Sequence, residues 1–288
     1  MIKIIVLCDF WKPLDAARVM EDVFQKGPDN YKDEIQFVGD NTFTHAIILN
    51  TYMPKLTIPK ENIIGLAWEP LEFLNISGQW LDYVKQNIGT YFIGRLRPDF
   101  PDNMKLGYPF MCHERRRDLY FENKTPEKTK LCCIIFSKKF MLPGHQYRVK
   151  LIEEILKSNL PIDIFGRGCP LIQKADSRVK GEFDSMEDSC KNYKYLISVE
   201  NTQSDSYISE KFMDCIYQNI IPIYWGASNV EKYFGPNCCF KLSGNIHDDM
   251  EMIKQILEKE SLLDLTIARN ELFTGKSYLM KFLFSMFT

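Results

Sequence analysis

Short apolar runs alternate with amphipathic stretches along the whole chain. The apolar runs predict strands at 2–7, 34–38, 45–49, 62–67, 90–94, 131–136, 161–165, 194–199, 220–224 and 237–241. Helical periodicity is clearest at 14–25, 146–158, 208–218, 248–259 and 276–286. Because strands and helices alternate in this way, the pattern predicts an α/β protein with parallel sheets covered by helices.

A change in composition near residues 113–130 divides this pattern into two parts. Residues 113–118 and 122–130 are highly charged and poor in apolar side chains, and a new apolar strand begins at Leu131. A chain of 288 residues is long enough for two domains. We therefore expect α/β domains at 1–125 and 126–288 with a cleft between them. The helix at 276–286 is apolar nearly all round, so it should be packed, with the first domain as a candidate surface.

Composition and charge exclude several classes of protein. Hydrophobic residues make up 45% and charged residues 26%, which is typical of a globular chain. A net charge of −2 gives no reason to expect nucleic acid or an anionic membrane as partner. The chain begins on a strand pattern without a signal peptide, and no apolar run is long enough to span a bilayer. Nine cysteines without zinc spacing indicate buried, reduced thiols. These features predict a soluble, cytoplasmic protein.

Residues 192–226 carry the clearest candidate chemistry. The pattern is a strand ending in Glu200-Asn201, a polar loop, a helix from Ser209, and a second strand ending in Trp225-Gly226. Ser209 is a good N-cap residue, so Glu210 and Lys211 fall in the first helical turn. A helix N-terminus favours phosphate, and a lysine adds a full positive charge. The alternative is an ordinary solvated helix start.

The same segment resembles the signature of the α1,3-fucosyltransferases, glycosyltransferase family 10. The shared features are a tyrosine-rich strand, Glu-Asn, a short loop, Tyr207-Ile208-Ser209-Glu210-Lys211, and Pro222-Ile223-Tyr224-Trp225-Gly226. Weaker similarity extends over residues 60–245. The resemblance implies a GT-B-like fold, with two facing Rossmann-like domains. The first would bind the acceptor and the second GDP-fucose, and transfer would proceed with inversion and without a metal in the donor site.

The resemblance also implies roles for individual donor-site residues. Lys211 would neutralise the donor phosphates, and Glu210 would contact the ribose or the sugar. Asn201 and Tyr207 would line the same pocket. Ser209 stands where the family usually has threonine, which keeps the hydroxyl.

A second similar unit runs from the strand at Cys133 to Arg148. In the family this strand–loop–helix unit supplies an arginine to the donor phosphates, which the planar guanidinium suits. The alternative is a surface arginine on an amphipathic helix. The loop departs from the family pattern, because Lys138-Lys139 stands where asparagine usually follows the serine. His145 lies close before Arg148 in sequence. One interpretation is that it reaches the donor, and the simpler one is a loop histidine.

Inverting transfer to a hydroxyl needs a base for the acceptor's proton, whereas the leaving diphosphate needs charge neutralisation. Glu69 is the candidate base, because it follows a buried strand of the first domain, where a loop would face the cleft. The resemblance places a glutamate at such a strand end, and Trp68 beside it would raise its pKa by desolvation. Alternatively, Glu69 merely ends a strand. The fallback carboxylates are Glu72, Glu61 and Asp9.

The leading hypothesis is an inverting glycosyltransferase that moves fucose from GDP-fucose to a hydroxyl of a glycan. An Asp-x-Asp metal clamp is missing from the sequence, so neither a metal nor another cofactor is expected. The alternatives are the same scaffold with another sugar nucleotide, an inactive carbohydrate-binding or nucleotide-binding relative, and a nucleotide-binding regulator. The sequence does not identify the acceptor, its linkage or the oligomeric state.

Overall fold

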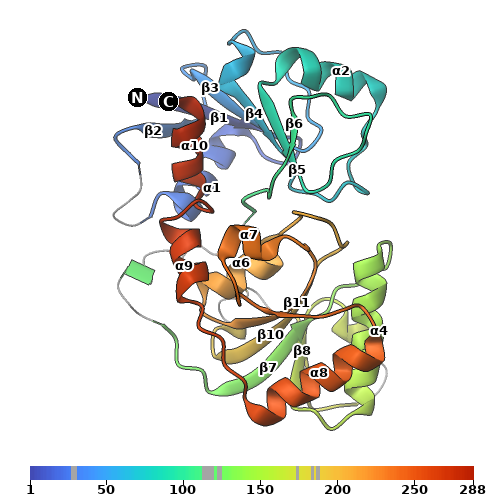
Figure 1. Ribbon diagram of the computed structural model, residues 1–288. Coiled ribbons are helices and arrows are strands. Elements are labelled where there is room, and N and C mark those ends of the chain that lie inside the picture. Colours follow the sequence, from blue (N-terminus) through green and yellow to red (C-terminus); the bar gives the residue numbers. More distant parts are fainter. Residues whose placement is uncertain (27–30, 112–119, 122–124, 173–174, 183–184, 186–188) are drawn as a thin grey trace.

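Two parallel sheets organise the molecule (Figure 1). The computed structural model describes residues 1–26, 31–111, 120–121, 125–172, 175–182, 185 and 189–288. Within these residues the first sheet has the strand order β2-β1-β3-β4-β5-β6. Its strands are β1 Ile2–Leu7, β2 Ile35–Val38, β3 His45–Leu49, β4 Ile63–Leu66, β5 Thr90–Ile93 and β6 Met104–Leu106. Each neighbouring pair is parallel.

The second sheet has the order β12-β11-β10-β7-β8-β9 in the same described part of the chain, again with parallel pairs. Its strands are β7 Lys130–Ile135, β8 Ile162–Phe165, β9 Val179–Gly181, β10 Tyr193–Val199, β11 Ile221–Trp225 and β12 Phe240–Lys241. Strands β10 and β11 are buried along nearly their whole length, because helices cover both faces of a parallel sheet.

The helices alternate with these strands as predicted. They are α1 Pro13–Phe24, α2 Gly78–Asn87, α4 Pro143–Lys157, α6 Glu210–Tyr217, α7 Val230–Phe234, α8 Ile246–Lys259, α9 Thr266–Phe273 and α10 Leu279–Phe287, with short 3-10 turns at Lys60–Asn62 and Cys169–Leu171. The predicted α/β class with two facing sheets is therefore confirmed.

The carboxyl ends of the two sheets face each other. Gly94, directly after β5, accepts a hydrogen bond from the Ser206 N–H at 2.9 Å, and Ser206 lies in the loop between β10 and α6. The Arg95 guanidinium donates to the Gln203 carbonyl in the same loop. In α/β proteins ligands bind beyond the carboxyl ends of the strands. Both sheets thus direct their functional edges into the region between them.

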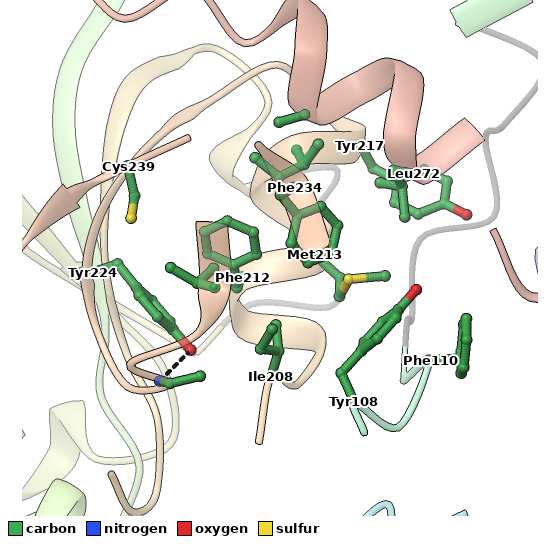
Figure 2. Close-up of a cluster of buried hydrophobic side chains, with 14 of the residues drawn as sticks. Tyr108, Phe110, Ile208, Phe212, Met213, Tyr217, Tyr224, Phe234, Cys239 and Leu272 are labelled. Atoms are coloured by element: carbon green, nitrogen blue, oxygen red, sulfur yellow. Dashed lines mark hydrogen bonds between the residues drawn. The ribbon is translucent and has the colours of Figure 1, made fainter. Parts of the chain in front are cut away.

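Apolar packing holds the two units together. Tyr108 and Phe110, which follow β6, lie against the core around Phe212 and Met213 of α6 (Figure 2). The ring of Tyr108 is 5.8 Å from that of Phe234 in α7. The Tyr108 hydroxyl also donates to the Ser277 carbonyl. One continuous apolar cluster therefore joins the second sheet to the first.

Helix α10 crosses back onto the first sheet (Figure 1). The Tyr278 hydroxyl, at the start of this helix, donates to the Phe24 carbonyl of α1 at 2.6 Å. The ring of Phe282 lies 5.2 Å from Phe92 of β5. The end of the chain thus contacts the first sheet, whereas the exact domain bounds at residues 125 and 126 stay a prediction.

Elements with little periodicity were missed from the sequence. Strands β6 and β9 have three residues each, too few to show alternation. Helix α2 begins at a real N-cap, because the Ser77 hydroxyl accepts from the Trp80 N–H at 3.2 Å. The strand expected at 237–241 is reduced to Phe240–Lys241. The charged run 113–118 lies outside the described residues.

The remaining global expectations concern membranes and thiols. Among the described residues, no helix combines the length and the apolar character needed to cross a bilayer. The eight cysteines in this part of the chain are free, and all are buried.

Candidate functional site

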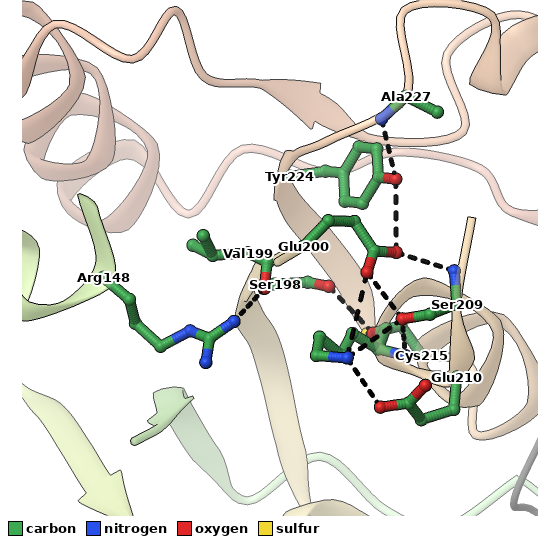
Figure 3. A network of polar contacts seen from close by, with 10 residues as sticks. Arg148, Ser198, Val199, Glu200, Ser209, Glu210, Cys215, Tyr224 and Ala227 are labelled. Atoms are coloured by element: carbon green, nitrogen blue, oxygen red, sulfur yellow. Dashed lines mark hydrogen bonds and ion pairs between the residues drawn. The ribbon is translucent and has the colours of Figure 1, made fainter. Parts of the chain in front are cut away.

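A fully buried carboxylate organises the end of strand β10. Glu200 is 0% exposed, and its Oε1 accepts a hydrogen bond from the Ser209 N–H at 2.8 Å. Its Oε2 accepts from the Ser209 hydroxyl at 2.5 Å (Figure 3). The Ser209 hydroxyl in turn accepts from the Lys211 N–H and caps α6. Glu200 therefore fixes where this helix begins.

Lys211 lies in the first turn of α6, as predicted, and its ammonium group contacts two carboxylates. Its Nζ is 2.7 Å from Oε1 of Glu210 and 3.9 Å from Oε2 of Glu200. Burial by itself lowers the pKa of Lys211, but the two glutamates outweigh burial and hold the pKa above its usual value. Lys211 is thus charged at neutral pH, and a quarter of its side chain is exposed.

Arg148 lies behind the end of β10 rather than on the surface. It is 5% exposed, and its guanidinium donates to the Val199 carbonyl (Figure 3). Burial lowers its pKa to about 10, against the opposing effects of Glu200 and Glu210, so it remains a cation. The start of α4 approaches the same turn, where the Gly144 N–H donates to the Asn201 carbonyl at 2.9 Å. A Cβ on Gly144 would lie 1.9 Å from the Glu200 carbonyl oxygen.

His145 belongs to the first turn of α4, so its interpretation as a loop histidine was wrong. It is 1% exposed, and its Nδ1 accepts a hydrogen bond from the Leu142 N–H at 3.2 Å. Burial and the nearby Arg148 lower its pKa to about 4. The imidazole is therefore neutral at physiological pH.

Asn201 and Tyr207, at either end of the β10–α6 loop, are both buried. Tyr207 packs against the first sheet, where a Cβ on Gly94 would lie 2.7 Å from its own Cβ. A pocket at this junction is lined by Pro70, Glu72, Gly94, Arg95, Thr202 and Tyr207. The predicted donor-site residues Arg148, Asn201, Tyr207, Glu210 and Lys211 are thus brought to one edge of the second sheet.

Glu69 lies across from this edge, on the turn after β4. The Oδ1 atom of Asn50 accepts hydrogen bonds from the Trp68 and Glu69 N–H groups at 2.9 and 3.0 Å. Burial raises the pKa of the Glu69 carboxyl, in the predicted direction, while Lys139 and Lys211 oppose the shift. These opposing cations belong to the second domain, so Glu69 faces the donor-site edge.

Aromatic packing accounts for part of the burial around Glu69. Trp68 is 7% exposed, and its ring lies 5.5 Å from that of Trp11. The ring of Phe10 is 6.3 Å from Trp68 and half-exposed. The loop after β1 thus places an aromatic cluster beside the candidate base.

The three alternative carboxylates, Glu61, Glu72 and Asp9, differ in whether they lie at the edge of the sheet that faces the site. Glu61 lies in the 3-10 turn before β4, at the amino edge of the sheet, so it is wrong as a candidate for a cleft base. Glu72 lies in the junction, where its Oε1 accepts from the Thr202 hydroxyl at 3.2 Å and contacts Arg95 at 3.5 Å. Asp9 is exposed after β1, at the carboxyl edge.

The roles of three residues of this site were not predicted from the sequence. Glu200 was noted as a strand end but given no role, although it directly precedes Asn201 in the motif. Asn50 adopts a left-handed conformation with a φ of 54°, which asparagine tolerates better than most residues. Lys139, noted as a departure from the family loop, lies 5.9 Å from the Phe73 ring of the opposite domain. In the part of the chain that the structure describes, no cluster of three or more potential metal ligands occurs.

Known proteins resemble the second half of the chain. Residues 125–258 match glycosyltransferase family 10 (fucosyltransferase) C-term. The Helicobacter pylori alpha-(1,3)-fucosyltransferase FucT is 37% identical over 95 residues, covering 30% of this chain and 19% of the relative. The chain spans between 14% and 26% of the length of the curated relatives it matches.

Solved structures support the fold. A crystal structure of α1,3-fucosyltransferase with GDP-fucose superimposes with a TM-score of 0.52 at 13% identity, covering 100% of this chain and 90% of that chain. The Anabaena protein HepE in complex with UDP-glucose superimposes with a TM-score of 0.59 at 11% identity, covering 99% and 98% of the two chains. Both neighbours have the GT-B arrangement, which confirms the predicted fold class and shows no more than the fold.

The raised pKa of Glu69 predicts a stability effect with a defined sign. Because burial raises the pKa of Glu69 in the folded protein, folding favours the protonated carboxyl. Below the unfolded-state pKa of about 4.3 the carboxyl is protonated in both states, and its burial carries no charge penalty. As the pH rises through the higher folded-state pKa, the buried carboxyl ionises and the folded state loses stability. Glu69→Gln carries no charge to desolvate. We therefore expect the variant to melt at a higher temperature than the parent at about pH 7.5, and the difference to vanish near pH 4.

Thermal unfolding of both proteins across this pH range measures the effect, with Glu61→Gln as a control at an exposed carboxylate. An increase that is the same at all pH values would contradict the burial of a charged Glu69.

Proposed function

We propose that this chain, whose residues 125–258 match the C-terminal model of glycosyltransferase family 10, is a fucosyltransferase. It would transfer fucose from GDP-fucose, with inversion, to a hydroxyl of a glycan. The observation that carries the proposal is the pairing of two cations, Lys211 in the first turn of α6 and Arg148 in the second turn of α4, with one carboxylate of raised pKa, Glu69, on the opposite edge. The α1,3-fucosyltransferase of Helicobacter pylori and the neighbour solved with GDP-fucose support the choice of sugar nucleotide.

The donor half would work by neutralising charge. As the bond to the sugar breaks, negative charge grows on the nucleoside diphosphate, and a fixed cation stabilises the transition state more than the bound substrate. Lys211 is held at the site by Glu210 at 2.7 Å and by the Ser209 hydroxyl at 3.1 Å. An arriving diphosphate would take over some of these contacts, so the ammonium is already in place when the donor binds.

The acceptor half would work by proton removal. A general base acts best when its pKa lies near the working pH. Burial raises the pKa of Glu69 in the direction of that range. The hydrogen bonds from Trp68 N–H and Glu69 N–H to Asn50 fix the turn that carries the carboxylate. A single carboxylate opposite two cations fits transfer from a nucleotide donor better than the paired carboxylates of glycosidases.

Another sugar nucleotide is the second candidate donor. The neighbour solved with UDP-glucose superimposes with the higher TM-score, 0.59, and the loop after β7 carries Lys138-Lys139 in place of the family's usual asparagine. We propose that transfer needs no obligatory metal, because an Asp-x-Asp clamp is missing from the sequence. Lys211, Lys139 and Arg148 would supply the positive charge instead.

Nucleotide binding tests the donor assignment. Saturating GDP is expected to raise the melting temperature of the protein, because a ligand that binds the folded state alone stabilises it by mass action. The increase should persist in EDTA and exceed the increase with UDP. Differential scanning fluorimetry with GDP, UDP and dTDP measures it. Strong stabilisation by UDP without any by GDP would indicate a uridine nucleotide donor instead of GDP-fucose. A GDP effect abolished by EDTA would contradict the metal-independent donor site.

Two substitutions separate the roles of base and cation. Glu69→Gln keeps size and hydrogen bonding but removes the proton acceptor, so kcat should fall by roughly 10²–10⁴ while GDP affinity barely changes. Lys211→Ala removes a cation from both the bound donor and the transition state, so GDP binding and transfer should weaken together. Isothermal titration with GDP and steady-state kinetics measure both, with Glu61→Gln as the matched carboxylate control. Normal turnover by Glu69→Gln would move the base to Glu72 or Asp9, and unchanged GDP binding by Lys211→Ala would disprove the assignment of the donor site.

A further inference from the structure

The imidazole of His145 carries a hydrogen-bond donor that the protein itself does not use. A backbone N–H can only donate, so the 3.2 Å contact from the Leu142 N–H makes Nδ1 an acceptor without a proton. In a neutral ring the proton must then be on Nε2. Burial and Arg148 keep the ring neutral, with a pKa of about 4. The cap at the start of α4 thus fixes the tautomer of His145.

This Nε2–H group is buried without a partner. His145 is 1% exposed, and among the described residues no atom meets hydrogen-bond geometry with Nε2. The Asn201 side chain makes a weaker polar contact with the ring, which opposes the lowering of the His145 pKa by burial and Arg148. A buried donor without an acceptor costs free energy, and native proteins seldom keep one without a reason. Because the cap needs Nδ1 alone, capping does not account for the second nitrogen.

The positive charges around His145 favour an anionic ligand. The ring lies in the first turn of α4, a helix of 15 residues whose positive dipole end points to the same region. Arg148, Lys139 and Lys211 all act on the pKa of His145 in the direction expected of nearby positive charge. A neutral donor near three cations can bind a phosphate oxygen without adding a further charge beside the buried Arg148, which burial would make costly.

We propose that the Nε2–H group of His145 donates a hydrogen bond to a phosphate oxygen of the bound nucleoside diphosphate. The inference rests on the proposed function, because the nucleotide is the leaving group of that reaction. The ring of Phe73, from the opposite domain, lies 6.3 Å from the imidazole. The phosphate position proposed here therefore borders the first domain as well as the second.

Two substitutions distinguish this role from helix capping. His145→Asn keeps an acceptor at the place of Nδ1 and removes the Nε2 donor. Its affinity for GDP should fall roughly 10- to 100-fold, the range for a hydrogen bond to a charged group, while the melting temperature without ligand stays near that of the parent. His145→Gln places an amide donor near Nε2 and should bind GDP within about threefold of the parent. His247→Asn, at a histidine whose side chain is 93% exposed, is the control.

Isothermal titration with GDP measures these affinities. A ¹⁵N NMR spectrum that resolves the histidine rings adds a readout independent of any variant. It should show the Nε2–H tautomer of His145 in the free protein and a downfield shift of that proton with saturating GDP.

Equal GDP affinity in His145→Asn and the parent would overturn the inference, and so would an Nδ1–H tautomer or a resonance that GDP leaves unchanged. If His145→Asn is unstable, the NMR result and His145→Gln decide the question. A parent protein that binds no nucleotide would instead mean that the proposed function itself is wrong.

Discussion

The buried carboxylate of Glu200 is the contact on which the candidate site depends. A fully buried charge is costly unless polar groups surround it, and here Ser209 supplies two hydrogen bonds while Lys211 supplies the opposite charge. Burial raises the pKa of Glu200, and the nearby Lys211 opposes this shift. The Tyr224 hydroxyl contacts the same carboxylate at 3.4 Å and accepts from the Ala227 N–H at 3.0 Å. Through these contacts one side chain positions the start of α6 and the loop after β11.

The second requirement is that the two sheets present their carboxyl edges to each other. Apolar contacts of Tyr108 with α7, of Phe110 with α10, and of α10 with β5 hold the units in this arrangement. Contacts at the edges themselves include the hydrogen bond from the Thr202 hydroxyl to Glu72 and the packing of Tyr207 against Gly94. The two units are thus joined by apolar packing away from the site and by further contacts at its edges.

Much of this arrangement could be predicted from the sequence. Apolar runs such as Tyr193–Val199 and Ile221–Trp225 are long enough to identify buried strands, and Ser209 marks the helix start that presents Lys211. The motif at 192–226 lies within the family match at 125–258. Short elements such as β6 were missed because three residues contain no period.

The remaining site features depend on contacts between residues far apart in sequence. Nothing near Asn50 in the chain shows that its side chain fixes the turn at Glu69, 19 residues away. The Nε2–H group of His145 can be identified as a candidate ligand donor when the partner of Nδ1 and the burial of Nε2 are both known. Glu61 and Glu69 are both charged residues beside the same strand, and the direction of β4 is what separates them.

The central claim is that a nucleoside diphosphate lies between the edge that carries Lys211 and Arg148 and the turn that carries Glu69. A crystal structure of the protein with GDP-fucose tests this most directly. We expect the diphosphate within hydrogen-bonding distance of Lys211 Nζ and the Arg148 guanidinium, with the sugar directed toward the Glu69 carboxylate. A nucleotide bound on the first domain, or bound at the second sheet with its sugar directed away from Glu69, would contradict it.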